Sequence, residues 1–272
     1  PPVVDNSPTV KSTTVRDGQT LYLYEYSQPI TYTAAGDYTI IATVINQGST
    51  ECGSTEDVEF DFSVSDIPEA KFTAPASACP GAVVNFTDQT DTKGVSTQTW
   101  NWDFGDAANA TAANPNTSAL QNPKHTYINP GNYTVTLAIA NINGCISSYQ
   151  QTIHINTVPT AAFTISPFNC ESRDITFTST STPGEGSITK LVWYFGDNSV
   201  PFTQTNNTPV THNYAQKGDY TVSLTATSST GCVSDIYTQN ITVFPMPQVD
   251  FTLPDVCLTD AFAQFTNTTS VN

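Results

Sequence analysis

The sequence repeats itself with a period of about 90 residues. The stretch HTYINPGNYTVTLAIANINGC at 125–145 returns as HNYAQKGDYTVSLTATSSTGC at 212–232. Three phenylalanines that open equivalent segments, Phe72, Phe163 and Phe251, are 91 and 88 residues apart. A solenoid unit has only about 20–50 residues, whereas a small β-sandwich has about 100. The period therefore predicts one whole sandwich per repeat rather than a solenoid.

Three proline-bearing segments separate the copies: SDIPEA at 65–70, NTVPTA at 156–161 and FPMPQV at 244–249. They divide the chain into 1–67, a partial or degenerate copy; 68–157 and 158–245, two complete copies; and 246–272, the N-terminal part of a further copy. Both ends of the sequence fall inside a copy. We therefore expect the natural chain to continue in both directions as a longer array.

Strands, not helices, account for the hydrophobic pattern. In NYTVTLAIA, Tyr133, Val135 and Leu137 alternate with Thr134 and Thr136, and a period of two is that of a half-buried strand. The 18 prolines and the many Thr and Asn residues favour strands and turns. We predict an all-β protein whose sandwiches follow one another in an extended array.

The charge balance excludes one class of partner. The chain has 24 acidic and 8 basic residues, a formal net charge of −16. Affinity for nucleic acids comes from Lys and Arg, so a nucleic-acid partner is excluded. An anionic lipid surface is disfavoured for the same reason, and no membrane insertion is expected.

The motif WNWDFGD at 100–106 resembles a site because it carries two carboxylates. Its second copy, LVWYFGD at 191–197, has Tyr194 in place of Asp103. A carboxylate that one repeat replaces by tyrosine is not shared chemistry, so Asp103 is predicted to point outward. Asp106 and Asp197 are kept, each directly after a glycine, where an Asp can hold a turn through backbone N–H groups. We interpret both as scaffold, with calcium binding as the lesser alternative.

The same alternation gives the candidate core. Trp102 and Phe104, and in the second repeat Trp193 and Phe195, are predicted to point inward. Further along each repeat, tyrosines stand just before a tight turn, where sandwich folds use a tyrosine corner. These tyrosines are Tyr127 and Tyr214.

Histidines give no catalytic pattern. His125 and His212 occupy equivalent places, and Ile30 takes that place in the first copy, which indicates a structural role. His154 stands alone in TIHIN. No Ser, His and Asp recur together at matched positions, and no phosphate-binding loop or zinc-protease motif is present. We predict that this chain is not an enzyme and has no cofactor, apart from the calcium alternative.

In order, W-x-F-G-D, H-x-Y and G-x-Y-T-V-x-L resemble the polycystic kidney disease (PKD) domain family over nearly all of 68–245. The first copy departs from this pattern, since TLYLYEYSQPITY at 20–32 lacks F-G-D. The resemblance implies seven-stranded, immunoglobulin-like sandwiches that serve as extracellular spacers or binding modules rather than catalysts. The Cys-bearing version resembles the PKD arrays of large secreted bacterial surface proteins, including gliding-motility adhesins.

Two functions fit these observations. The first is a structural stalk or filament segment of a secreted bacterial cell-surface adhesin, acting as a rigid spacer. The alternative is a substrate-binding or spacer module of a secreted protease or glycosidase. Both place the chain outside the cell. The expected partners are neighbouring repeats of the same chain, with a polysaccharide or another surface protein as further candidates.

Six isolated cysteines indicate disulfides and an oxidising location. One lies in the loop after each first strand and one after each long Tyr-Thr-Val strand: Cys79, Cys170 and Cys257, then Cys52, Cys145 and Cys232. In sandwich topology these loops lie at opposite ends of a domain, too far apart for the ~7 Å Cα separation that a disulfide allows. This favours Cys79 with Cys232, across repeats, leaving the other four to pair mostly beyond the given chain. The alternative is pairing within repeats, Cys79–Cys145 and Cys170–Cys232.

Overall fold

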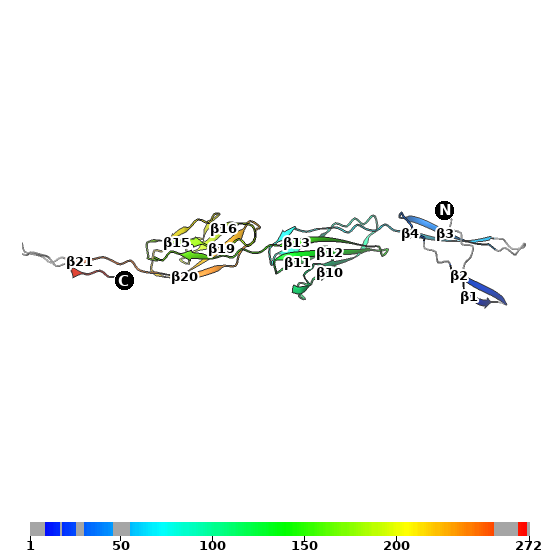
Figure 1. Ribbon diagram of the computed structural model, residues 1–272, viewed down its shortest axis with the longest axis horizontal. Helices are drawn as coiled ribbons and strands as arrows, with labels where there is room; N and C mark the ends of the chain where they lie inside the picture. The colour runs from blue at the N-terminus through cyan, green and yellow to red at the C-terminus, as the bar shows by residue number, and fades with distance from the viewer. Residues whose placement is uncertain (1–8, 17, 26–29, 46–54, 253–265, 271–272) are drawn as a thin grey trace, which may run out of the picture.

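The computed structural model describes residues 9–16, 18–25, 30–45, 55–252 and 266–270. Its elements follow one another along a single long axis (Figure 1). Two β-sandwiches occupy the middle, strand hairpins lie toward the N-terminus, and a short strand pair lies toward the C-terminus (Figure 1). The described residues contain no helix apart from one 3-10 turn, Ala107–Asn109. The prediction of an all-β, extended array is therefore confirmed.

The first full repeat consists of two facing layers of strands. Its strands are β5 (Phe72–Thr73), β6 (Ser77–Ala78), β7 (Val83–Asn85), β8 (Thr87–Asp88), β9 (Thr97–Asp103), β10 (Thr117–Ser118), β11 (Lys124–Thr126), β12 (Gly131–Asn141) and β13 (Ile146–Ile155). One layer is the sheet β10-β9-β12-β13-β6, in which only β6 runs parallel to its neighbour. The pairs β5-β8 and β11-β7 form the other layer.

The second full repeat has the same arrangement. Its strands are β14 (Phe163–Ile165), β15 (Asp174–Ser179), β16 (Ile188–Tyr194), β17 (Phe202–Gln204), β18 (Val210–Asn213), β19 (Gly218–Ser228) and β20 (Tyr237–Val243). The sheet β17-β16-β19-β20 faces the three-stranded sheet β14-β15-β18.

Each repeat has its own hydrophobic core, because the alternating strands turn their apolar residues inward. Trp102 and Trp193 are completely buried, and Phe104 and Phe195 are at most 4% exposed. Trp102 contacts Phe72 edge to face across the two layers, with ring centroids 5.1 Å apart. Trp193 and Phe163 repeat this contact at 5.1 Å. The two cores share no residue.

The prediction assigns the tyrosine corner to the wrong tyrosines: those before the tight turn rather than those after it. Tyr127 and Tyr214 are fully buried core residues, but their hydroxyls donate to the carbonyl oxygens of Phe104 and Phe195, on the opposite layer, at 3.0 and 2.8 Å. The bond to the backbone four residues upstream is made instead by the first tyrosine of the long strand. Tyr133 donates to Asn129 O at 2.9 Å. Tyr38 and Tyr220 make the same bond to Ala34 and Gln216 at 2.8 Å.

The structure describes only part of the first copy. Its strands are β1 (Thr9–Arg16), β2 (Gln19–Glu25), β3 (Gly36–Ile45) and β4 (Thr55–Val64), and they form two separate hairpins. The pattern of β3 predicts a half-buried strand, yet Ile40 is 43% exposed and Phe60 on β4 is 68% exposed. Both positions are exposed because, among the described strands, β3 and β4 form a two-stranded sheet with no facing layer like that of the full repeats. Beyond β20, β21 (Phe251–Thr252) pairs with β22 (Thr266–Asn267).

The two neighbours Trp102 and Asp103 allow a matched test of this core. Trp102→Ala should lower the free energy of unfolding by about 3–5 kcal/mol, as for other large buried aromatics. Asp103→Asn, on the outer face of the same strand, should change it by no more than about 0.5 kcal/mol. Urea unfolding followed by circular dichroism measures both. Similar losses for the two variants would show that the inward and outward faces of β9 are wrongly assigned.

Candidate functional site

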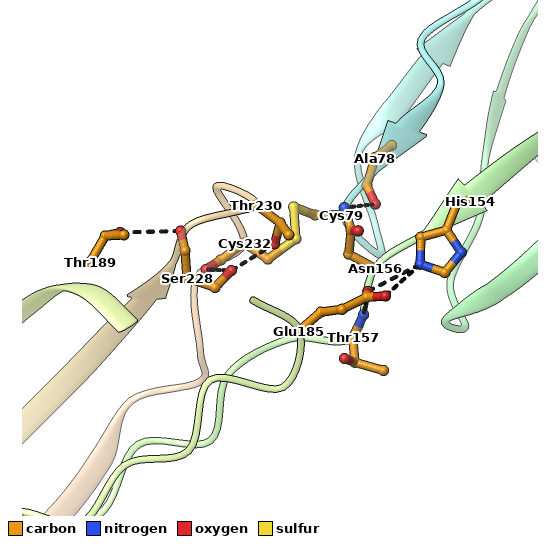
Figure 2. The surroundings of a disulfide bond; sticks show 10 residues. All are labelled: Ala78, Cys79, His154, Asn156, Thr157, Glu185, Thr189, Ser228, Thr230 and Cys232. Carbon is orange, nitrogen blue, oxygen red and sulfur yellow. Dashed lines mark hydrogen bonds and ion pairs between the residues drawn. A yellow bond between two sulfur atoms is a disulfide. The ribbon is translucent and has the colours of Figure 1, made fainter. Parts of the chain in front are cut away.

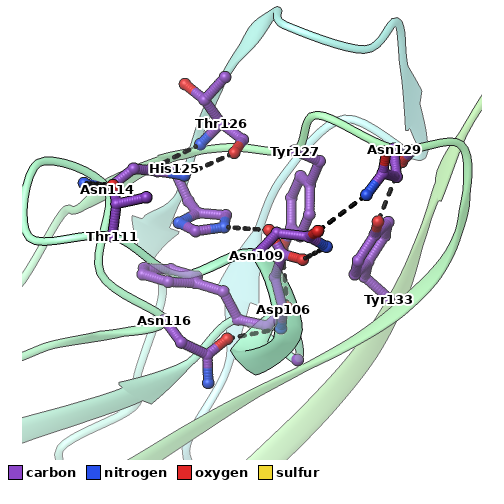
Figure 3. Close-up of polar contacts among 12 residues, drawn as sticks. Asp106, Asn109, Thr111, Asn114, Asn116, His125, Thr126, Tyr127, Asn129 and Tyr133 are labelled. Carbon is purple, nitrogen blue, oxygen red and sulfur yellow. Dashed lines mark hydrogen bonds and ion pairs between the residues drawn. The ribbon is translucent and has the colours of Figure 1, made fainter.

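The F-G-D turn of the first repeat contains a buried carboxylate–histidine pair. Asp106 is 2% exposed and His125 is 1% exposed. His125 Nε2 lies 3.2 Å from Asp106 Oδ2 and donates to it, since a carboxylate only accepts. The other oxygen, Oδ1, accepts a bond from Asn109 Nδ2 at 2.6 Å (Figure 3). Asp106 N donates to the side-chain oxygen of Asn116. Protein groups therefore satisfy both oxygens of this carboxylate.

The second repeat contains the same pair in a more open setting. His212 Nε2 lies 2.8 Å from Asp197 Oδ2, and Ser199 N donates to Asp197 Oδ1 at 3.1 Å. The side chains of His212 and Asp197 are 17% and 20% exposed. Burial disfavours the charged carboxylate, but the hydrogen bonds from Ser199 and His212 outweigh this effect. The pKa of Asp197 is therefore lowered from its ordinary value.

Each histidine is also held between aromatic rings. His125 stacks on Phe104 with centroids 4.5 Å apart and meets Tyr127 edge-on at 4.6 Å. In the second repeat, His212 stacks on Phe195 at 3.9 Å. Burial, with the nearby aspartate charge as a smaller cause, raises the pKa of Tyr127 well above the ordinary tyrosine value. This packing fixes the ring planes, and so aims each Nε2 at its carboxylate.

The glycine of F-G-D is required by a close backbone approach. Gly105 has φ +71°, and a Cβ there would lie 2.6 Å from the carbonyl oxygen of Thr134 on β12. Gly196 is equivalent, with φ +82° and a Cβ position 2.5 Å from the Thr221 oxygen. Only a residue without a side chain lets this turn pack against the long strand.

The two repeats hold the turn through different aspartates. In the second repeat Asp197 accepts the backbone N–H of Ser199, as the sequence predicts. In the first repeat the equivalent bond comes from Asp103, whose Oδ1 accepts from Gly105 N at 2.9 Å. Asp106 accepts from side chains, so its predicted backbone-capping role is wrong for this repeat. Asp103 is exposed, as is its counterpart Tyr194.

The arrangement around each F-G-D turn is a carboxylate–histidine pair rather than a larger cluster of titratable side chains. Within the described residues, no three His, Cys, Asp or Glu side chains group closely enough to hold a metal ion, and the calcium candidates Asp106 and Asp197 are each paired with a histidine. Ser199 bonds to Asp197 rather than to the ring of His212. A nucleophile would have to contact the histidine. The geometry is that of a structural polar cluster.

Sequence reasoning missed the carboxylate–histidine partnership. It treated Asp106 and His125 as two separate scaffold residues. They are 19 positions apart in the sequence and come from facing layers, but their side chains are in contact. A signal was present in the repeats: Asp197 and His212 recur together, while the first copy lacks both F-G-D and the histidine. Joint presence and joint absence predict contact.

A second candidate site lies where the two full repeats meet. Cys79 and Cys232 form a disulfide, with Cα atoms 5.5 Å apart across 153 residues of sequence (Figure 2). Cys79 follows β6, which pairs with the C-terminal end of β13. Cys232 lies in the hairpin between β19 and β20. The bond therefore joins the end of one repeat to the beginning of the next, as the cross-repeat pairing requires.

The remaining cysteines are not bonded to one another within a repeat. Cys145 and Cys170 are half-buried and not disulfide-bonded, so the alternative pairs Cys79–Cys145 and Cys170–Cys232 do not form. Cys145 lies at the start of β13 and Cys79 beside its end. About ten residues of strand at about 3.3 Å each separate them. Cys52 and Cys257 lie outside the described residues.

Comparison with known families agrees with this architecture. The family model described as "PKD domain" matches residues 65–157 and 156–243, about two thirds of the sequence. The chain belongs to the PKD domain family. Each match contains one complete F-G-D turn and one complete core.

Similar PKD segments occur in bacterial proteases. The chain is 36% identical over 110 residues to a microbial collagenase of Vibrio alginolyticus, a match that covers 40% of this chain and 13% of the collagenase. The PKD1 domain of the Vibrio cholerae metalloprotease PrtV is 26% identical, with a TM-score of 0.28, over 34% of this chain and all of that domain. The fibronectin(III)-like modules of Clostridium thermocellum CbhA share 14% identity and a TM-score of 0.35, over 65% of this chain and 94% of theirs. No described helix is both long and apolar enough to span a membrane.

Two glycines with the same backbone conformation test the close approach in the F-G-D turn. Gly144→Ala, at φ +81° with open space around its Cβ position, should cost only the left-handed conformation, about 1–2 kcal/mol. Gly105→Ala should cost about 1–3 kcal/mol more, because its Cβ meets Thr134 O. Urea unfolding of both variants provides the comparison, and equal losses would contradict the steric explanation.

The lowered pKa of Asp197 predicts acid sensitivity of the second repeat. Its folded-state pKa lies below the unfolded value of about 3.9. The stabilisation is therefore complete above that value and is lost as the pH falls through the folded pKa. Asp197→Asn should unfold at lower urea than the wild type at pH 5, with a smaller difference at pH 3. The control is Asp235→Asn, at an exposed position in the same repeat, whose urea midpoint should stay close to that of the wild type at both pH values. If Asp197→Asn lowers the midpoint by the same amount at pH 5 and pH 3, the ionic explanation is wrong.

Proposed function

We propose that this chain is a non-catalytic, stiff spacer segment of a secreted bacterial cell-surface adhesin, in which tandem PKD repeats form a stalk or filament. The observation that carries the proposal is the disulfide between Cys79 and Cys232. A disulfide within a repeat would stabilise that repeat alone. A disulfide between repeats adds a second covalent connection at the joint, beside the chain itself, and so restricts bending.

The positions of the other cysteines support the same joint along an array. Cys170 lies beside Phe244 at the end of the second repeat, as Cys79 lies beside the end of β13. Cys145 lies in the β12–β13 hairpin of the first repeat, which is equivalent to the β19–β20 hairpin that carries Cys232 in the second. Each full repeat thus offers one cysteine at each end, which suits covalent joints to the neighbours on both sides. Neighbouring repeats of the same chain are the proposed partners.

Charge and redox chemistry support an extracellular position. A disulfide that fixes the shape of the molecule persists in an oxidising compartment and is reduced in the cytosol. The net charge of −16 makes parallel copies repel one another. An acidic, disulfide-linked rod therefore remains extended and separate from its neighbours, as a stalk that carries an adhesive tip requires.

The match to a collagenase favours one alternative. PKD repeats of this chain would then form a substrate-binding or spacer module of a secreted protease. Co-sedimentation of the chain with insoluble collagen tests this alternative. Saturable binding would favour it over the stalk, and recovery of the chain in the supernatant would count against it.

Small-angle scattering tests the spacer proposal. The disulfide-bonded chain should scatter as a narrow, elongated particle. A Cys79→Ser/Cys232→Ser variant should keep its strand content by circular dichroism, because each repeat has its own core, but give a broader and shorter distribution of intramolecular distances. A compact particle in the disulfide-bonded form, or identical curves for the two forms at pH 8, would overturn the proposal.

A further inference from the structure

We infer that His154 of the first repeat and Glu185 of the second form a pH-sensitive latch across the joint, beside the disulfide. His154 Nε2 lies 2.8 Å from Glu185 Oε1 and 3.1 Å from Oε2. Glu185 Oε2 also accepts the backbone N–H of Thr157, in the linker, at 3.1 Å. One carboxylate from the second repeat therefore binds both the last strand of the first repeat and the connection between them (Figure 2).

Both ring nitrogens of His154 face acceptors. Nδ1 lies 2.6 Å from Asn132 Oδ1 on β12, opposite the two carboxylate oxygens at Nε2. A neutral imidazole has one N–H, whereas the imidazolium has two. While the Asn132 oxygen faces the ring, only the protonated ring donates to both partners at once. The charge on the ring therefore decides whether its contact with Glu185 is an ion pair or a neutral hydrogen bond, and histidine side chains in general change charge between about pH 5 and 8.

The charged surroundings of the ring are simple. Within the described part of the chain, Glu185 is the only ionisable group in contact with His154; Asn132 from β12 is neutral. Deprotonation of the ring removes the ion pair. The neutral ring keeps its bond to Glu185 or to Asn132, and it keeps both once the Asn132 amide turns over; in either case its contact with Glu185 is no longer an ion pair.

The loop that carries Glu185 is fixed to the hairpin that carries the disulfide. Ser229 N donates to Ser187 O at 2.7 Å, and Ser187 N donates to Ser229 Oγ at 3.2 Å. Gly184, at φ +67°, packs where a Cβ would lie 2.4 Å from Val158 O in the linker. The latch and the disulfide thus hold the same end of the second repeat. While the disulfide is closed, it already restricts bending of the joint and the latch adds little. When the disulfide is open, the latch determines how freely the joint bends.

The latch is specific to this joint among the copies in the sequence. Ser63 and Thr242 occupy the place of His154 in the other copies and bond to Asp37 and Asp219, within their own repeats. Gly94 stands where Glu185 stands in the second repeat. This inference rests on the proposed role of the chain as a spacer, because bending at a joint matters for a protein whose function depends on its extended length.

Energy transfer between dyes, one attached through an unnatural amino acid at an exposed position in each repeat, measures the latch in a Cys79→Ser/Cys232→Ser background. The ratio of bent to straight molecules should rise about two- to fivefold between pH 5.5 and 8, the effect expected of a half-exposed pair. Glu185→Gln should abolish this dependence. Asn132→Asp, which copies Asp37 and Asp219 and cannot donate, should keep the joint straight to higher pH.

Each result has a separate meaning. Absence of pH dependence in the double-serine background, or dependence unchanged by Glu185→Gln, would overturn the latch; the second outcome would assign the effect to His125 or His212, inside the repeats. A bent, compact molecule with the disulfide intact would overturn the spacer proposal instead. Should the double variant not fold, amide exchange in the intact protein gives the test. Protection of Thr157 should fall two- to fivefold with pH, while Asn156, bonded to Ala78 O at 2.9 Å, stays constant.

Discussion

The burial of one tryptophan between two facing sheets is the constraint on which each repeat depends. Trp102 and Trp193 are the largest side chains that are fully removed from water, and each contacts a phenylalanine from the opposite layer. Every other inward residue packs around this contact. The first copy, whose described strands lack a facing layer, shows the consequence. Its alternating strand forms, but Ile40 remains accessible to water.

The F-G-D turn places a polar group, its aspartate carboxylate, beside the aromatic core, and this group must be satisfied. The turn brings a carboxylate under the long strand, which only glycine permits at Gly105 and Gly196. A histidine from the facing layer then supplies the donor. An unpaired buried carboxylate would cost several kcal/mol (~3–5), so the Asp–His pair and the glycine belong together. The same residues that resemble a catalytic or calcium site are therefore explained as the internal support of the sandwich.

The contacts between the two full repeats differ in kind from those within them. Among the described residues, the two hydrophobic cores share no member, so each sandwich is stabilised by its own core. The connection is made by short-range polar and covalent contacts: the Cys79–Cys232 bond, the Glu185 carboxylate on His154 and the linker, and the close fit of Gly184. Because each repeat has its own core, we expect that these contacts can be opened chemically without unfolding either repeat.

The sequence by itself determined the strands, their inward faces and the tandem order; it favoured Cys79 with Cys232 but left pairing within repeats open until the structure decided it. The strands, faces and order follow from local periodicity and from repeats compared with one another. Only the tertiary structure decided that Asp106 meets His125, that Tyr133 rather than Tyr127 closes the corner, and that His154 reaches Glu185. The physical reason is that each of these choices depends on ångström-scale offsets between layers or between repeats. Those offsets are set by how whole sheets stack, and no local pattern of side chains encodes them.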